Sequence, residues 1–289
     1  MSQAANEHGA LNLSQGFPDF SISDALIDRV NYYMKKGLNQ YAPMPGVPVL
    51  RKNIAEKVRK TYGVTYDPDL EINITAGATQ GIYSAITSII QEGDEVIVFE
   101  PAYDSYVPSV RLNGGIIKYA QLTYPDYRID WEQLPGLISG QTRMIIINSP
   151  HNPTGSVLSK DDMEKLEQLV RNTNIIILSE EVYEHLIFDN IRHESIGYYP
   201  ALAARSFVIG SFGKTYHATG WKLGYVLAPE KLMIEFRKVH QFVVFACNTP
   251  IQHAVAEFLE DESTYNSLGT FFQEKRDYFV EKIQGSRFR

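Results

Sequence analysis

The sequence predicts an α/β protein with a mostly parallel central sheet. From residue 70 onward, short apolar runs rich in β-branched residues alternate with longer amphipathic stretches, a pattern typical of βαβ units. The chain has 289 residues, which is enough for one large domain or two ordinary ones with a substantial hydrophobic core. No internal repeat or low-complexity tract competes with this interpretation.

The elements follow in order along the chain. The first fifty residues are rich in turn formers, at 15–20 and 41–48, and their proline content predicts no long regular element there. A helical pattern follows at 49–62. The predicted strands are 72–75, 95–99, 115–120, 144–148, 175–179, 206–210 and 223–227. The further predicted helices are 79–91, 103–112, 160–172, 230–242 and 251–283, the last with a break near 260–267.

The composition is that of a soluble globular protein, with 44% apolar and 21% charged residues. The net charge of −7, from 27 basic and 34 acidic side chains, favours neither nucleic acid nor an anionic membrane as a partner. The apolar runs are too short to span a bilayer, and the N-terminal residues lack the pattern of a signal peptide. We therefore expect a cytoplasmic protein.

Cysteine and histidine usage excludes two further kinds of site. The single cysteine, Cys247, excludes an internal disulfide framework and fits a reducing compartment. It also excludes a metal site built on cysteines, and the seven histidines show no close ligand spacing. We therefore expect no metal centre.

Ligands of parallel α/β sheets bind at the carboxyl ends of the strands, so the residues after each predicted strand are candidate site residues. Gly77, Ala78 and Thr79 follow the first strand and lead into a helix, whose N-terminus and glycine amides suit a phosphate. The alternative is a tight turn in which Thr79 caps the helix. Tyr103 follows the next strand and could stack on a planar ring, although a tyrosine there is more often ordinary packing.

Two later strands are also followed by polar side chains. Asn152 lies in a turn between two prolines, which would fix its amide to donate to a phenolate oxygen, and we interpret the neighbouring His151 as a turn residue rather than a base. After 175–179, the Glu180 carboxylate could hold a pyridinium nitrogen protonated, and Tyr183 could hydrogen-bond a ring oxygen. Because side chains alternate between the faces of a strand, both reach one ring only if the strand ends near Glu180.

Lys214 follows the strand 206–210, with Ser211 before it and a second cation, Lys222, after it. A desolvated lysine amine forms a Schiff base with an aldehyde, and Ser211 and Lys222 suit a phosphate. If Lys214 and its neighbours are considered alone, the alternative is a solvated lysine in a turn. Taken together, the groups after successive strands match the parts of pyridoxal phosphate.

At these positions the chain resembles the class I/II aminotransferases of fold type I, a three-layer α/β fold. Within them it is similar to the branch of methionine aminotransferases and kynurenine/glutamine aminotransferases. The matching motifs are NLSQGFPDF at 12–20, NQY at 39–41, GAT at 77–79, EPAY at 100–103, NSPHNPTG at 148–155, EVYEH at 181–185 and the segment 211–224. The resemblance implies transfer of the amino group of a hydrophobic or sulfur-containing L-amino acid to a 2-oxo acid.

The resemblance also implies roles for individual residues. Lys214 would bind the cofactor aldehyde and then shuttle a proton at the substrate α-carbon. The cofactor would be held by Gly77, Ala78, Thr79, Ser211 and Lys222 at its phosphate, by Tyr103 on its ring, by Glu180 at its ring nitrogen, and by Asn152 and Tyr183 at its phenolic oxygen. Gly16 and Asn152 would line the substrate pocket. Tyr41 would reach the phosphate of a neighbouring subunit, which implies a homodimer with shared sites.

Two features depart from the family pattern. The acid at the ring nitrogen is aspartate in the family, and Glu180 is one methylene longer, so we expect weakened but not lost activity. The chain is short of the pattern at both ends, so we expect the small C-terminal domain, with its substrate-binding arginine, to be mostly absent and the helical tail to expose apolar surface. We expect an N-terminal arm and dimer segment over 1–48, a large cofactor-binding domain over 49–245 and a helical connection over 246–289.

Two other functions stay open at this point. One is a carbon–sulfur β-lyase on the same fold, although the motifs at 16–20 and 39–41 favour an aminotransferase. The other is a protein that binds pyridoxal phosphate without turnover. Glu180 and the missing arginine favour that alternative. An enzyme is favoured by the presence of Lys214, Asn152, Tyr183 and Lys222.

Overall fold

The computed structural model describes the chain except for residues 14, 17, 19 and 288–289. Among the described residues, seven strands form one sheet in the order β1-β7-β6-β5-β4-β2-β3. Their bounds are β1 Ile72–Thr75, β2 Glu95–Glu100, β3 Ile116–Gln121, β4 Thr142–Asn148, β5 Ile176–Glu180, β6 Ser206–Ser211 and β7 Gly224–Leu227. Only β7 runs antiparallel to its neighbours, which confirms the prediction of a mostly parallel sheet.

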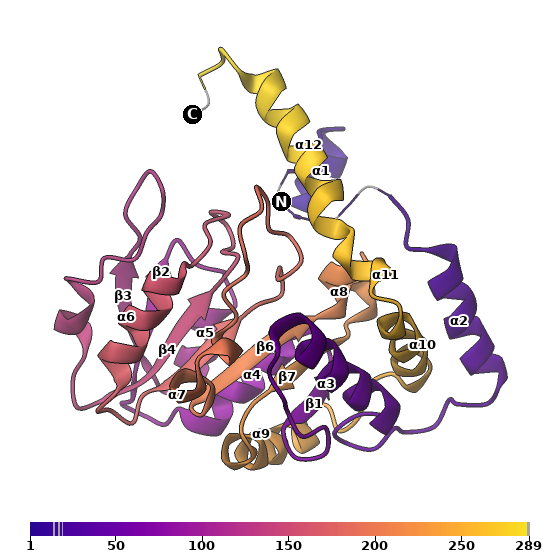
Figure 1. Cartoon of the computed structure of the whole chain (residues 1–289), viewed down its shortest axis with the longest axis horizontal. Helices are drawn as coiled ribbons and strands as arrows, with labels where there is room; N and C mark the ends of the chain where they lie inside the picture. Colours follow the sequence, from indigo (N-terminus) through magenta and orange to yellow (C-terminus); the bar gives the residue numbers. More distant parts are fainter. Residues whose placement is uncertain (14, 17, 19, 288–289) are drawn as a thin grey trace.

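Helices cover both faces of this sheet and give the three layers that the family resemblance implied (Figure 1). One face packs against α3 (Pro48–Tyr62), α6 (Lys160–Val170), α7 (Pro200–Ala203) and α10 (Thr249–Glu260). The other packs against α4 (Ala78–Ile89), α5 (Tyr106–Leu112) and α9 (Glu230–Val243). Along β4, Ile145 and Ile147 enter the first core and Met144 and Ile146 the second, because successive side chains point to opposite faces.

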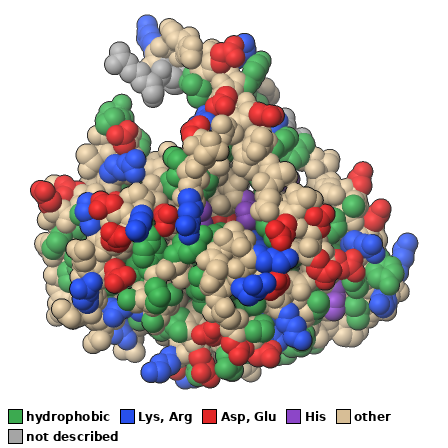
Figure 2. Space-filling model, viewed as in Figure 1, with side chains coloured by type: hydrophobic (Ala, Val, Ile, Leu, Met, Phe, Trp, Pro, Cys, Tyr) green, Lys and Arg blue, Asp and Glu red, His purple; other side chains and the backbone are tan. Residues whose placement is uncertain are grey.

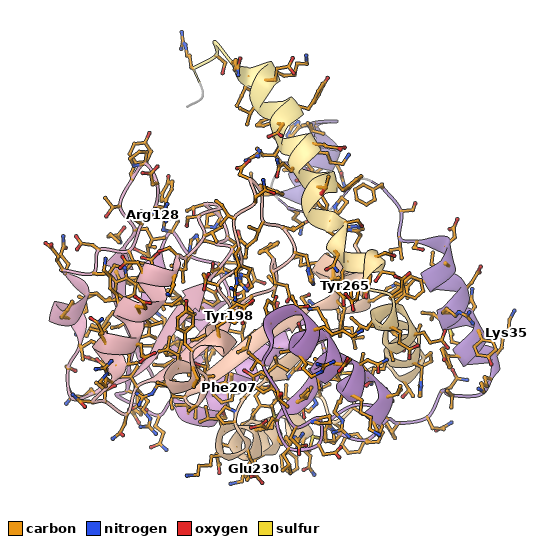
Figure 3. The ribbon with its side chains drawn as sticks, viewed as in Figure 1. Lys35, Arg128, Tyr198, Phe207, Glu230 and Tyr265 are labelled. Atoms are coloured by element: carbon orange, nitrogen blue, oxygen red, sulfur yellow. The ribbon has the colours of Figure 1, made fainter. Side chains whose placement is uncertain are left out.

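The interior is mainly apolar on both sides of the sheet, and most charged side chains lie outside, although a few, such as Lys57 and Glu184, are buried. Phe207 of β6 packs against Phe236 of α9, with ring centroids 6.1 Å apart, whereas Lys35 and Glu230 lie at the periphery (Figure 3). Figure 2 shows acidic and basic side chains interspersed over the viewed face. Within the described part of the chain, no helix is long and apolar enough to cross a membrane, and no cluster of His, Cys, Asp or Glu could hold a metal ion.

The N-terminal segment is more regular than its sequence predicts. It contains α1 (Ser2–Glu7) and α2 (Asp24–Lys35), so the expectation of no long regular element in the first fifty residues is wrong. No proline lies between Pro18 and Pro43, which leaves room for α2. Leu26 is buried, and Tyr33 stacks on His253 of α10 with ring centroids 5.1 Å apart. Packing against α10 therefore stabilises α2, which the turn-rich segments on either side of it kept from being predicted.

The C-terminal region contains the predicted helices and the predicted break. After α10, the short α11 (Ser263–Asn266) precedes α12 (Leu268–Ile283), which projects from the body as an arm (Figures 1 and 2). Leu268 is the buried residue of α12, whereas Tyr278 and Phe279 are 64% and 62% exposed. The expectation that the helical tail exposes apolar surface is confirmed.

Candidate active site

The carboxyl ends of the strands surround a cavity of about 160 Å³. Most residues predicted for the cofactor site line it: Gly77, Ala78, Thr79, Tyr103, Asn152, Glu180, Tyr183, Ser211, Lys214 and Lys222. They come from segments that the sheet topology brings together, since β1, β7, β6 and β5 are successive neighbours. Val182, Gly213, Thr219 and Leu223 also line the cavity and were not predicted as site residues, although they lie within the motifs at 181–185 and 211–224.

Lys214 lies on α8 (Phe212–Thr215), a single turn that begins where β6 ends. Its Nζ lies 5.3 Å from the centre of the Tyr183 ring and donates to the carbonyl oxygen of Gly16 at 3.4 Å. Burial lowers the pKa of Lys214; the Glu180 carboxylate opposes this effect and the Lys222 ammonium adds to it. The amine is therefore easier to deprotonate than a solvated lysine, as a nucleophile or base requires.

The turn between β1 and α4 has a shape that requires glycine. Gly77 is the N-cap residue of α4 and has φ +79°, which side-chain-bearing residues rarely adopt. A Cβ at Gly77 would lie 3.3 Å from Nζ of Lys222, so this ammonium packs directly over the turn. At Gly224 a Cβ would lie 3.1 Å from the backbone nitrogen of Ala78. A positive side chain and helix N-terminal amides thus share one corner of the cavity.

Thr79 does not cap α4, which corrects one of the two interpretations of that turn. No side chain caps the helix, and the Thr79 hydroxyl instead lies 3.1 Å from the Tyr103 hydroxyl. Tyr103 itself lies in the turn before α5, because α5 begins at Tyr106 rather than at 103. The rings of Tyr103 and Tyr106 meet edge to face, with centroids 5.6 Å apart. Tyr103 is therefore held at the cavity wall by contacts on two sides.

Glu180 is the last residue of β5 and is 3% exposed. Its Oε2 accepts a hydrogen bond from the Tyr106 hydroxyl. Burial raises the pKa of Glu180 to about 7, although the Tyr106 hydrogen bond and the positive charge of Lys214 lower it. Because β5 ends here, as the prediction required, Glu180 and Tyr183 both line the same cavity.

Asn152 lies in an ordered turn after β4. Its backbone N–H donates to Oδ1 of Asn148 at 2.7 Å, and the Asn148 side chain donates to the carbonyl oxygen of Glu180 at 2.9 Å. The neighbouring His151 lies 2.8 Å from the Thr154 hydroxyl through Nδ1, and burial lowers its pKa to about 4. His151 lies in the turn after β4 and lines the adjoining cavity described below rather than the 160 Å³ cavity.

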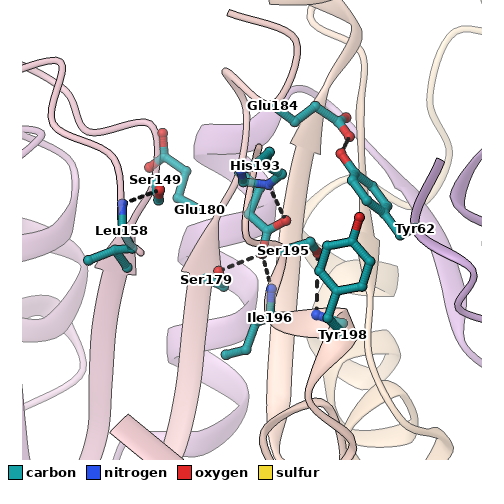
Figure 4. A network of polar contacts seen from close by, with 12 residues as sticks. Tyr62, Ser149, Leu158, Ser179, Glu180, Glu184, His193, Ser195, Ile196 and Tyr198 are labelled. Carbon is teal, nitrogen blue, oxygen red and sulfur yellow. Dashed lines mark hydrogen bonds and ion pairs between the residues drawn. The ribbon is translucent and has the colours of Figure 1, made fainter. Parts of the chain in front are cut away.

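In the sequence, Tyr183 lies between two buried glutamates, Glu181 and Glu184, and Figure 4 shows Glu184 with one of its donors, Tyr62. Glu181 accepts from the Ser179 hydroxyl at 2.8 Å and from the Ile196 backbone at 3.0 Å, and it lies 2.9 Å from Nε2 of His193. On the other side, Glu184 accepts from Lys57 at 2.5 Å, from Tyr225 at 2.9 Å and from Tyr62. The partners of Glu184 come from distant parts of the chain, whereas those of Glu181 lie within 15 residues of it, so contacts of both kinds anchor the segment that carries Tyr183.

Two predicted residues lie apart from the cavity lining. Gly16 reaches the site only through its carbonyl oxygen, which accepts from Lys214. Ser14, Phe17 and Asp19 of the same motif lie outside the described residues. Tyr41 is 82% exposed and contacts the edge of the Phe245 ring, so this subunit's own cavity does not include it.

A second cavity, of about 390 Å³, adjoins the first and shares Asn152 and Tyr183 with it. Its wall is mainly apolar: Pro150, Pro153, Val157, Leu186, Ile187, Phe188 and Ile191. At its edge, Arg276 of α12 binds both oxygens of Asp189, at 2.8 and 2.6 Å. Space beside the polar cavity can therefore accept a largely apolar group.

Comparisons with known proteins agree with this geometry. A family model described as aminotransferase class I and II matches residues 9–289. The methionine aminotransferase of Escherichia coli (strain K12) is 46% identical over 99% of this chain and 75% of its own length. Human kynurenine–oxoglutarate transaminase 1 is 34% identical over 96% of this chain and 67% of its own length.

Solved structures give the same result. The structure of YbdL from Escherichia coli, described as having a methionine aminotransferase function, superposes with a TM-score of 0.96 at 46% identity. It covers 99% of this chain, and this chain covers 76% of it. The N-succinyldiaminopimelate aminotransferase of Mycobacterium tuberculosis superposes with a TM-score of 0.95 at 35% identity, over 98% of this chain and 74% of that one. The chain belongs to the class I and II aminotransferases.

Proposed function

We propose that this protein transfers the amino group of a hydrophobic or sulfur-containing L-amino acid to a 2-oxo acid. Enzymes of its family use pyridoxal phosphate. When bound, this cofactor supplies an aldehyde that captures the amino group and a ring that withdraws electrons from the substrate α-carbon. The observation that carries the proposal is the convergence of Lys214, Glu180 and Lys222 on one cavity.

The residues that line the cavity fit this cofactor. The Gly77 turn has no side chain where Lys222 approaches it, which leaves backbone amides and an ammonium for a phosphate dianion. A buried carboxylate, Glu180, suits a protonated ring nitrogen, and the partly desolvated amine of Lys214 suits an aldehyde. Charge and hydrogen-bonding groups thus match each end of the cofactor.

Each residue then has a proposed task. Gly77, Ala78, Thr79, Ser211 and Lys222 would bind the phosphate, Tyr103 the ring face, and Asn152 and Tyr183 the phenolic oxygen. Glu180 would hold a proton at the ring nitrogen. Lys214 Nζ would bind the aldehyde and, once displaced by substrate, would take and return the proton of the substrate α-carbon. Gly16 and Asn152 would contact the substrate.

Two observations support a hydrophobic or sulfur-containing substrate. One is the similarity to the Escherichia coli methionine aminotransferase over most of both chains. The other is the apolar cavity that adjoins Asn152 and Tyr183, because apolar walls favour side chains that leave water readily. A carbon–sulfur β-lyase and a binding protein without turnover are the alternatives that the experiment must separate.

The proposal includes a homodimer in the cytoplasm. Tyr41 and Phe242 are 82% and 86% exposed and Phe245 is 44% exposed, an apolar group that suits contact with a second copy. The single cysteine, Cys247, is free and buried, which fits a reducing compartment. Sedimentation at micromolar concentration tests the dimer, and a monomer that binds cofactor fully would contradict the role of Tyr41.

The decisive experiment uses the purified chain reconstituted with pyridoxal phosphate and mixed with L-methionine. Conversion of the cofactor absorbance band, with formation of the 2-oxo acid, is expected. A parallel reaction with an S-alkyl-L-cysteine, whose sulfur is bonded to the β-carbon, tests the lyase alternative: pyruvate, ammonia and a released thiol would instead indicate a carbon–sulfur β-lyase. An absorbance band that neither amino acid changes, with no product formed, would indicate binding without turnover. Lys214→Ala should bind the cofactor noncovalently and show no detectable transamination; measurable turnover in that variant would refute the assignment.

A further inference from the structure

Tyr106 lies behind Glu180 and outside the cavity. It is the first residue of α5 and is 2% exposed. Its hydroxyl donates to Oε2 of Glu180, and within the described residues no other side chain donates to this carboxylate. Glu180 lines the cavity and Tyr106 does not, so the phenol holds the carboxylate from its far side.

A buried carboxylate needs such a partner. An ionised carboxylate removed from water is destabilised unless hydrogen bonds or opposite charges compensate it. Lys214 is the positive charge that acts on Glu180 from the cavity, and the phenols of Tyr103 and Tyr183 are titratable groups beside it. When the charge of Lys214 no longer acts on Glu180, the Tyr106 hydrogen bond still stabilises the ionised carboxylate.

Side-chain length gives this contact a second consequence. Glutamate has one more rotatable bond than the aspartate that the resemblance implies at this position, so its carboxylate has more ways to turn from the cavity. A hydrogen bond from a buried, ring-packed tyrosine selects one of these orientations. The ring of Tyr106 is itself fixed in the core beside α4 and against Tyr103.

We propose that Tyr106 is a positioning residue, whose hydroxyl stabilises the ionised form of the Glu180 carboxylate and orients it toward the place of the cofactor ring nitrogen. This inference rests on the proposed function, since Glu180 touches the cofactor only in that assignment. Tyr106 acts through Glu180 and contacts neither cofactor nor substrate.

The test compares Tyr106→Phe with Tyr62→Phe. Both substitutions keep the ring and remove a hydroxyl that donates to a buried glutamate, but the partner of Tyr62 is Glu184, which does not line the cavity. The first measurement is the titration of the Glu180 carboxyl by ¹³C NMR in the cofactor-free protein, with the resonance assigned by its loss in Glu180→Gln. Because the hydrogen bond stabilises the ionised form, Tyr106→Phe should raise the midpoint by about one to two pH units. Tyr62→Phe should leave it unchanged.

The second measurement is the pH dependence of the absorbance of the bound cofactor in the same variants. A displaced profile in Tyr106→Phe alone is expected, together with weaker cofactor binding. An unmoved Glu180 midpoint, equal shifts in both variants, or a shifted midpoint with an unchanged cofactor profile would each overturn the positioning role. If Tyr106→Phe does not fold, 3-fluorotyrosine at position 106, a stronger donor, should lower the midpoint, and no change would refute the inference.

Failure of the proposed function gives a different result. If Glu180 does not contact the cofactor, Glu180→Gln leaves the spectrum of the bound cofactor unaltered. The Glu180 titration in the cofactor-free Tyr106→Phe variant still reports on the contact itself. The two failures are therefore distinguishable.

Discussion

Lys57→Met is expected to destabilise the protein more than any substitution of an exposed charge. Lys57 of α3 and Glu184 form a buried ion pair, with side chains 2% and 6% exposed and a 2.5 Å separation between Nζ and Oε1. Methionine fills a similar volume but leaves the Glu184 carboxylate buried without its positive partner. The phenols of Tyr62 and Tyr225 still donate to it, but they carry no charge.

The magnitude follows from the loss of one partner of a buried pair. Such a loss costs about 3–5 kcal/mol of unfolding free energy, because the remaining charge is desolvated without compensation. At about 2–4 °C per kcal/mol for a chain of this size class, the melting temperature should fall by about 6–20 °C. Thermal and urea unfolding followed by circular dichroism measure both quantities.

The pH dependence of this effect has a definite sign. Burial raises the pKa of Glu184, but Lys57, with smaller contributions from His185 and Tyr62, outweighs burial and holds that pKa well below its ordinary value of 4.5. The pair therefore stabilises the fold above pH 4.5, and this contribution is lost as pH falls through the lowered pKa. In Lys57→Met the folded pKa of Glu184 rises, so the carboxyl protonates on mild acidification. The stability gap between wild type and variant should narrow as pH falls from 7 toward 4.5.

Two controls make the result interpretable. Lys57→Met combined with Glu184→Gln removes both charges and keeps an acceptor for the two phenols, so it should regain most of the lost stability. Lys238→Met removes a cation that pairs with Glu235 on the surface, where the side chains are 64% and 47% exposed, and should change stability by less than about 0.5 kcal/mol. A Lys57→Met cost below about 1 kcal/mol, or no recovery in the double variant, would refute the reasoning.

Two more predictions concern the phosphate corner and the sheet. Lys222→Met should weaken pyridoxal phosphate binding about 10- to 100-fold, because it removes a charged hydrogen-bond donor. Pyridoxal, which has no phosphate, should bind equally well to the wild type and the variant in an absorbance titration. Equal losses of affinity for the two ligands would contradict the phosphate role of Lys222. Gly210→Ala should lower the free energy of unfolding, measured by urea denaturation, by about 1–3 kcal/mol, because its Cβ would lie 2.2 Å from the Tyr225 ring. Gly136→Ala is its control, with no atom within 4 Å of the added carbon, and equal stability of the two variants would contradict the packing argument.

Strands were the most predictable elements of this fold. Strands covered on both faces are apolar on both faces, so most of the strands here are short apolar runs between turn formers, although the edge strand β3 is largely exposed. The order β1-β7-β6-β5-β4-β2-β3 and the reversed direction of β7 have no such local signature, because pairing depends on contacts between residues far apart in the chain. Helix α2 was not predicted, because the prolines on either side of it indicated turns, whereas tertiary packing on α10 makes the segment helical.

The candidate site was predictable where it follows strand ends. Lys214, Asn152 and Glu180 each come directly after a strand or at its end, so a parallel sheet brings them to one edge. Their supporting partners were not predictable. Tyr106 lies 74 residues from Glu180 and Lys57 lies 127 residues from Glu184, and neither belongs to a recognisable motif.

The sequence by itself determined the α/β class, the strand positions, the family and the residue types of the site, because periodicity and strand-end motifs are local properties of the chain. Only the tertiary structure decided the strand order, the lowered pKa of Lys214, and the buried partners of Glu180 and Glu184. Desolvation and charge pairing depend on which distant segments meet and on how much water they exclude. A linear sequence contains no measure of either before the chain has folded.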